Sequence, residues 1–217
     1  RTLRIRANAN PDASEQKMLL RKLSISHPTL PLPKLSLNRS ERFRRADRLA
    51  QRWHYEEALL EYETLFVEKY RRKACAWKIA VILQSKVRRE PARVRQLLAP
   101  ITESMNHKHR EEAVYRTIRA YIKEDLYQEA LGLIDAYDRD FPEGRYSETI
   151  AYYRGWLPYD SGKCTKGLPA LRTYVKHFSK RRRHVRGFIA WCHIRHSRWK
   201  SAIRGFAPLL REKDSMH

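Results

Sequence analysis

From residue 41 onward, apolar and small residues recur with a helical spacing, and the whole pattern repeats about every 36 residues. Four copies, at residues 55–59, 127–131, 164–168 and 199–203, place a small residue three positions after an aromatic or apolar one. A weaker copy lies at residues 92–94. The compact positions are Ala58, Val94, Ala130, Gly167 and Ala202, and twelve residues before each stand Ala46, Ile82, Ile118, Gly155 and Ala190.

Compact residues at two such positions fit a helical hairpin, because two helices pack closely only where side chains are small. The pattern therefore predicts five hairpins of about 36 residues each. We expect an all-α fold, a right-handed superhelix of five helical hairpins. The scarcity of glycine, with 7 residues in 217, argues against turn-dense β-sandwiches and Gly-rich phosphate loops.

The first 40 residues follow a different pattern. Pro28, Pro31 and Pro33 disfavour a helix, and leucines alternate with other residues between positions 30 and 37. We expect an extended strap at residues 1–40 that lies against the body of the protein, and a solenoid at residues 41–217.

The spacing resembles the tetratricopeptide repeat over residues 41–212. That repeat has a small residue in its first helix, an aromatic before a small residue in its second, and a proline after it. Gly155, Tyr127 with Ala130, and Pro142 stand at these places. The resemblance implies an α-solenoid whose first helices line a concave, partner-binding surface.

A second resemblance concerns residues 152–163, which begin Tyr-Tyr-Arg-Gly-Trp-Leu and continue with Tyr159 and Gly162. This block is similar to a hairpin in the helical superhelix region of bacterial soluble lytic murein transglycosylases. The resemblance implies a non-catalytic part of a cell-wall protein that binds peptidoglycan, with a periplasmic or cell-envelope location. A cytoplasmic location is the alternative.

The catalytic residues of such an enzyme are not found in this chain. A transglycosylase needs a general-acid Glu followed by Ser and a Gly-Leu-Met-Gln segment, but Glu103-Ser104 offers the dipeptide alone. We expect Glu103 to be a helix-end residue, and we expect no catalytic set and no cofactor. If the chain belongs to a lytic transglycosylase, the catalytic part lies outside it.

The charge is the most unusual feature of the composition. The formal net charge is +22, and residues 161–211 carry 14 basic side chains and no acidic one. A solvated helical face normally mixes both signs. The run Lys180, Arg181, Arg182 and Arg183 falls between the fourth and fifth hairpins, where we expect it to bind anions. The alternative function is therefore a basic repeat adaptor that binds nucleic acid or another polyanion.

The repeat register also predicts a ligand-binding surface. The residue after each compact position of the first helices is Asp47, Leu83, Arg119, Trp156 or Trp191. With their neighbours, the last three hairpins would present aromatic rings for stacking and cations for carboxylates or phosphates. The candidate concave-face residues are Tyr115, Arg119, Lys123, Tyr152, Trp156, Tyr159, His184, Trp191 and Arg195. The competing interpretation is that the tryptophans pack between helices.

Cysteine and histidine spacings give little support for a metal site. Three cysteines without a CxxC motif predict isolated thiols in helices. His193 and His196 would share a helical face, but we expect Cys192 to point elsewhere and therefore expect no metal site.

No segment of the sequence is long and apolar enough to be a transmembrane helix. A repeat array buries one face of each hairpin against its neighbour, so terminal repeats need a cap. Only seven residues follow Leu210, which leaves the last apolar face for a continuation, a partner protein or a second copy of the chain.

Overall fold

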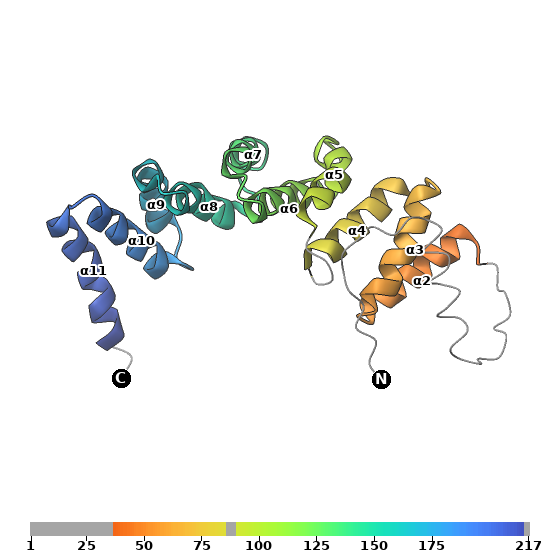
Figure 1. The fold of residues 1–217 in the computed structure, drawn as a ribbon, viewed down its shortest axis with the longest axis horizontal. Helices are drawn as coiled ribbons and strands as arrows, with labels where there is room; N and C mark the ends of the chain where they lie inside the picture. The colour runs from red at the N-terminus through yellow and green to blue at the C-terminus, as the bar shows by residue number, and fades with distance from the viewer. Residues whose placement is uncertain (1–36, 86–89, 215–217) are drawn as a thin grey trace, which may run out of the picture. The chain divides into compact units, whose positions relative to one another are not determined.

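The computed structural model describes residues 37–85 and 90–214. Within this part, the chain forms ten α-helices and no β-strand, joined by short turns (Figure 1). The helices are α2 (Arg39–Gln51), α3 (Tyr55–Val67), α4 (Arg72–Ser85), α5 (Pro91–Thr102), α6 (Arg110–Lys123), α7 (Tyr127–Asp140), α8 (Ser147–Asp160), α9 (Cys164–His177), α10 (Arg182–Arg195) and α11 (Trp199–Asp214).

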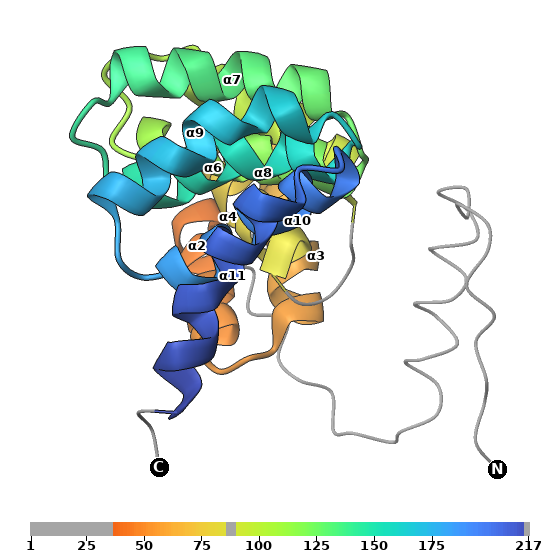
Figure 2. The same ribbon diagram turned by 90° about the vertical axis from the view of Figure 1, so that its left-hand side faces the viewer.

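Consecutive helices pair into the five expected hairpins, α2 with α3 through α10 with α11, and each hairpin packs against the next. The second helices α7 and α9 lie together on one side of α6 and α8 (Figure 2). The all-α solenoid predicted from the repeat is therefore confirmed. The expected strap lies outside the described residues apart from its last positions, so that expectation stays a prediction.

The compact positions of the repeat form the centre of every hairpin. All ten are buried, and Ala46, Ala58, Ile118 and Ala130 are fully inaccessible to solvent. The approach is closest between α8 and α9, where a Cβ atom on Gly155 would lie 2.5 Å from Cδ2 of Leu171. A Cβ atom on Gly167 would overlap the carbonyl oxygen of Gly155. Glycine is required at both positions because the two backbones nearly touch.

In each of the third and fourth hairpins, a partly buried hydrogen bond joins the two helices. The Tyr137 hydroxyl donates to the Glu111 carboxylate at 2.6 Å, and the Tyr174 hydroxyl donates to Glu148 at 2.9 Å. Each pair is 26 residues apart and occupies the same two places in its hairpin. In the last hairpin these places hold Arg183 and Leu209, and the Arg183 guanidinium donates to the Leu209 carbonyl oxygen at 3.2 Å.

The end of the last hairpin exposes apolar side chains. Trp199, Ile203 and Leu210 of α11 are 59%, 69% and 67% exposed. In the preceding hairpin, the position equivalent to Ile203 is Leu168, which is 6% exposed beneath the next helices. An open apolar face was expected here, and self-association through it stays a prediction. No helix in the described ranges meets the length and apolarity of a membrane span.

We predict that Gly155→Ala lowers the free energy of unfolding by about 1–3 kcal/mol, because the added methyl group overpacks the α8–α9 contact. Gly132→Ala in α7 is the matched control, since no atom lies within 4 Å of its added Cβ. Alanine favours a helix over glycine by up to about 1 kcal/mol, so the control should be neutral or stabilising. Urea unfolding measures both, and equal destabilisation by the two variants would contradict this packing.

We also predict that the protein loses stability as the pH rises above 10. Burial, followed by the hydrogen bond to Glu148, raises the pKa of Tyr174 to about 12. In the unfolded chain a tyrosine ionises near pH 10, so the stabilisation present below that pH is lost between about pH 10 and 12. Urea unfolding across this range should show a shallower decline for Tyr174→Phe, and an unchanged decline would contradict the assignment.

Candidate binding surface

The residue that follows the compact position of each first helix has different surroundings from one hairpin to the next. Asp47 accepts hydrogen bonds from the Tyr62 hydroxyl at 2.6 Å and from the Lys78 ammonium at 2.5 Å. Leu83 is buried, with 1% of its surface exposed. Arg119 and Trp156 are partly exposed, while Trp191 is 53% exposed. The first two hairpins therefore use this position for packing and ion pairing, and the last three hairpins present it to solvent.

An aromatic group joins α6 to the start of α8. The Tyr115 ring stacks on Tyr146 with centroids 4.0 Å apart, so one face of this predicted ligand-binding ring is used in packing. The Arg119 guanidinium lies 5.8 Å from the Tyr115 ring centre. Burial, followed by the charge of the neighbouring Tyr115, raises the pKa of Tyr153 to about 12. This group therefore combines packing with one accessible cation.

A second aromatic group lies on α8. The Tyr152 and Trp156 rings stack with centroids 6.2 Å apart, and the Arg181 guanidinium lies 4.7 Å from the Tyr152 ring centre. Arg181 is exposed. The turn before α10 is thus tied to α8 by a cation–π contact, which brings a predicted anion-binding residue onto the predicted aromatic surface.

The same surface continues from α8 onto α10 around Phe188. Its ring lies 4.6 Å from Tyr159 and 4.6 Å from His184, and the Arg195 guanidinium lies 5.6 Å from the Tyr159 ring centre. Phe188 is missing from the residues predicted from the sequence, although it lies three residues before Trp191 and four after His184, so the helical period places it on the same face as both.

An open pocket of 650 Å³ lies between the turn before α10, α10 itself and the end of α11. It is lined by Ser179, Lys180, Arg181, Arg183, His184, Gly187, Phe188, Trp191, Leu209 and Leu210. Five of these residues are predicted from the sequence. The basic run predicts Lys180, Arg181 and Arg183, and the concave-face register predicts His184 and Trp191. The structure thus brings three residues of the basic run and two of the predicted concave-face residues together at one place.

The basic run does not act as four equivalent cations. Lys180, Arg181 and Arg183 line the pocket, whereas Arg182 donates to the Phe178 carbonyl oxygen at 3.1 Å and lies outside the lining. Within the described part of the chain, none of the four is paired with a carboxylate, and residues 161–211 contain no acidic side chain. The uncompensated charge makes the pocket attractive to anions.

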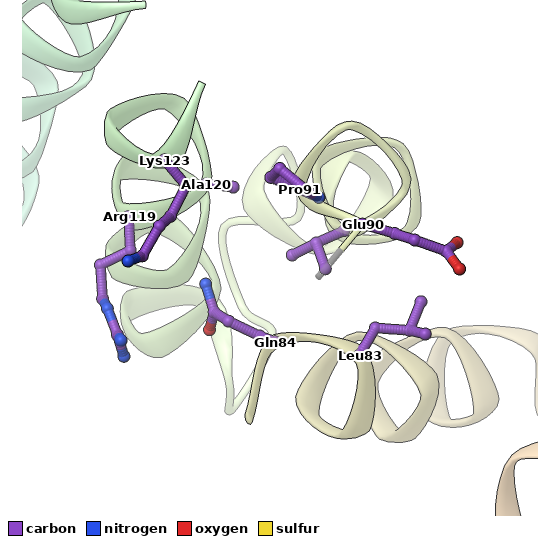
Figure 3. A pocket seen from close by; sticks show the side chains of 8 residues that line it. Leu83, Gln84, Glu90, Pro91, Arg119, Ala120 and Lys123 are labelled. Carbon is purple, nitrogen blue, oxygen red and sulfur yellow. The ribbon is translucent and has the colours of Figure 1, made fainter. Parts of the chain in front are cut away.

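A second pocket, of 370 Å³, lies between α4, α5 and α6. Figure 3 shows Ala120 and Pro91 facing each other across it, with Gln84 and Leu83 on the adjacent helix. The predicted residues Arg119 and Lys123 also line it. Its lining residues Gln84 and Glu90 stand on either side of a gap in the described part of the chain, so we assign this pocket no binding role.

Two of the three cysteines form a disulfide, Cys164 with Cys192, which joins α9 to α10. The expectation of isolated thiols is therefore wrong for this pair and correct for Cys75, which is buried and free. The two cysteines lie in different hairpins, 28 residues apart, so a repeat of about 36 residues does not reveal that they meet.

The histidines are also arranged differently from the sequence expectation. His193 is 9% exposed, and the burial of its imidazole lowers its pKa. Cys192 does not point away from His196. Instead, the sulfur atoms of Cys164 and Cys192 and one ring nitrogen of His196 all lie within 4.8 Å of one another.

Glu103 is the exposed residue that ends α5, as expected for a helix-end carboxylate. Several other acidic side chains of the first four hairpins pair with cations: Arg154, for example, binds Asp135 at 2.6 Å and Asp138 at 2.7 Å. These carboxylates stabilise helix contacts.

No protein-family model matches the chain, and no curated protein sequence matches it. Solved structures do. MamA 41-end from Desulfovibrio magneticus RS-1 is 17% identical, with 82% of this chain and 97% of that one covered and a TM-score of 0.64. A MamA RS-1 double mutant is 18% identical, with 83% and 97% covered and a TM-score of 0.64.

A Podosopora anserina protein of nearly identical TPR-like repeats, described as a kinesin light chain, is 15% identical. The alignment covers 81% of this chain and 95% of that one, with a TM-score of 0.58. These similarities establish a fold of tetratricopeptide-like hairpins. They give no support to the resemblance to lytic transglycosylases, or to glycan or nucleic-acid partners.

We predict that loss of the disulfide lowers the free energy of unfolding by about 3–4 kcal/mol, the loop-closure entropy for cysteines 28 residues apart. The measurement compares oxidised protein with protein refolded in a reductant and a metal chelator. In the Cys164→Ser, Cys192→Ser double variant the reductant should have no further effect. Equal stability of the oxidised and reduced wild-type protein would contradict the prediction.

Proposed function

We propose that this chain is a protein-binding repeat scaffold that captures an acidic segment of a partner protein in the pocket of its last hairpin. One observation carries the proposal: Lys180, Arg181 and Arg183 line the same pocket as the exposed Trp191. Carboxylates of a bound segment would meet the cations at the turn, and an apolar side chain would contact the ring.

The apolar part of the pocket supports an anchored peptide rather than a purely electrostatic contact. Phe188, Trp191, Leu209 and Leu210 contribute apolar walls, and Leu210 is 67% exposed. Exposed ion pairs contribute only about 0–1 kcal/mol each, and salt screens them. Burial of a leucine or phenylalanine side chain of the partner would supply about 1.5–3 kcal/mol more.

A single-stranded nucleic acid is less well supported, because stacking platforms for bases need free ring faces. Trp156 stacks on Tyr152, and Arg181 lies over that same Tyr152 ring. Tyr115 is stacked on Tyr146. Trp191 and His184 are exposed rings that line the pocket, and the His184 ring is in edge contact with Phe188, so the pocket suits a single anchoring side chain better than a row of bases.

A more specific proposal is a role at the cell wall, in which the same surface binds peptidoglycan. Its support is the aromatic and basic character of α8 and α10, since rings stack on sugars and cations bind the carboxylates of stem peptides. The disulfide suits an oxidising compartment, which supports a periplasmic or cell-envelope location. The cytoplasm remains the alternative location.

We predict that a labelled peptide of repeated Glu-Glu-Leu binds the full chain, and that the same peptide with Gln in place of Glu binds at least about fivefold more weakly. Trp191→Ala should weaken binding by a similar factor at near-physiological salt. The triple variant Lys180→Gln, Arg181→Gln, Arg183→Gln should weaken it most at low salt. Fluorescence anisotropy measures all of these affinities.

Trp53→Ala is the matched control for the ring, because Trp53 is 68% exposed in the first hairpin. Arg44→Gln, Arg48→Gln, Arg52→Gln removes the same charge from exposed positions there. Equal losses in these controls would reduce the proposal to nonspecific attraction. Salt-resistant binding of peptidoglycan fragments or single-stranded DNA, lost in Trp191→Ala, would assign the pocket to that ligand class instead.

A further inference from the structure

Three side chains with metal-ligating atoms meet where α9 packs against α10. Cys164 begins α9, Cys192 lies within α10, and His196 follows its last residue. Both cysteines are buried, with 1% and 0% exposed, whereas His196 is exposed. One ligand atom from each lies within 4.8 Å of the other two. The site is therefore closed on the protein side and open to water on the histidine side.

The spacing of these atoms is within reach of a tetrahedral zinc site. Zinc binds sulfur at about 2.3 Å and imidazole nitrogen at about 2.0–2.1 Å, so two ligand atoms at the tetrahedral angle lie roughly 3.5–3.8 Å apart. The histidine nitrogen lies within 4.8 Å of both sulfur atoms, so a rotation of its side chain would bring it to this distance. Once the bond between the sulfur atoms is opened, they need only move apart by side-chain rotation to admit the ion.

We propose that Cys164, Cys192 and His196 form a redox-controlled zinc site. A dithiol reductant gives two electrons and two protons to the disulfide and is itself oxidised to a disulfide. Zn²⁺ then binds both cysteines as thiolates, with release of two protons, and the neutral imidazole of His196. Water occupies the fourth position on the exposed side, as is usual where three protein side chains bind zinc.

The charge around the site fits thiolate ligands. Arg195 and Arg198 flank His196 in the sequence, and no acidic side chain occurs from residue 161 to 211. Nearby cations stabilise a thiolate relative to the thiol, which favours the reduced form of the pair with its ligands deprotonated. Two thiolates and one Zn²⁺ sum to zero, so the bound ion adds no charge to this basic region.

Either state links the same two helices. The disulfide joins α9 to α10 covalently, and the zinc ion would join them through its ligands. The turn at the other ends of these helices carries Lys180 and Arg181, which line the basic pocket together with Arg183 of α10. The site lies at the start of α9 and the end of α10, so it would keep these two helices joined under both oxidising and reducing conditions. This inference does not depend on the ligand of the pocket.

Cobalt binding tests the proposal directly. The full chain carrying Cys75→Ser, which removes the third thiol, is reduced with a phosphine without oxygen and titrated with Co²⁺. We expect a thiolate-to-cobalt charge-transfer band with one equivalent of Co²⁺, tetrahedral ligand-field bands, and loss of both when Zn²⁺ is added. The oxidised protein should show neither. Absence of the bands after reduction, or bands of equal strength in the oxidised protein, would overturn the proposal.

Two histidine variants separate a specific site from a thiol pair alone. His196→Ala should weaken Zn²⁺ binding by at least about tenfold in competition with a chromogenic chelator. His177→Ala, at the exposed end of α9, should have no effect. Equal affinity of the two variants would exclude His196 as a ligand and overturn the proposal.

The proposal remains testable if reduction loosens the fold. In that case Zn²⁺ should restore the helical circular dichroism of the reduced protein, because binding to the folded state stabilises it. The same addition to the Cys164→Ser, Cys192→Ser variant should change nothing. Failure of Zn²⁺ to restore the wild-type signal would contradict the proposal as well.

Discussion

The structure depends on one close approach between the two helices of each hairpin. The residues at that contact are buried in all five hairpins and are alanine or glycine in the first, fourth and fifth; in the fourth the backbones of Gly155 and Gly167 nearly touch. A close contact fixes the rotation of each helix about its axis. The contact thereby determines which neighbouring residues face solvent. Because Gly155 and Ala190 face the partner helix, the adjacent Trp156 and Trp191 are directed away from the contact.

Charge is distributed unevenly on this regular scaffold. Buried tyrosines of the third and fourth hairpins donate to Glu111 and Glu148, whereas the last hairpin has Arg183 bonded to a backbone carbonyl at the equivalent place. The last hairpin therefore has a cation where the two hairpins before it have a carboxylate. The helical packing is kept, and the exposed surface changes from charge-balanced to basic, which produces a polarised array with its anion-attracting pocket at one end.

The sequence alone predicts features that recur and misses those that occur once. The five hairpins could be found because their compact residues repeat about every 36 positions. The disulfide between Cys164 and Cys192 could not, since it joins different places in two hairpins. The stacking of Tyr115 on Tyr146 and the position of Arg181 over Tyr152 depend on side-chain directions in the turns, which periodicity does not specify.

The central claim is that one end of the repeat array forms a binding pocket for an acidic segment. Amide hydrogen exchange of the full chain, with and without a saturating acidic peptide, tests it most directly. The account predicts slower exchange in the turn before α10, in α10 and at the end of α11, where the pocket lies. Protection confined to α2–α5, or unchanged exchange throughout at saturation, would contradict it.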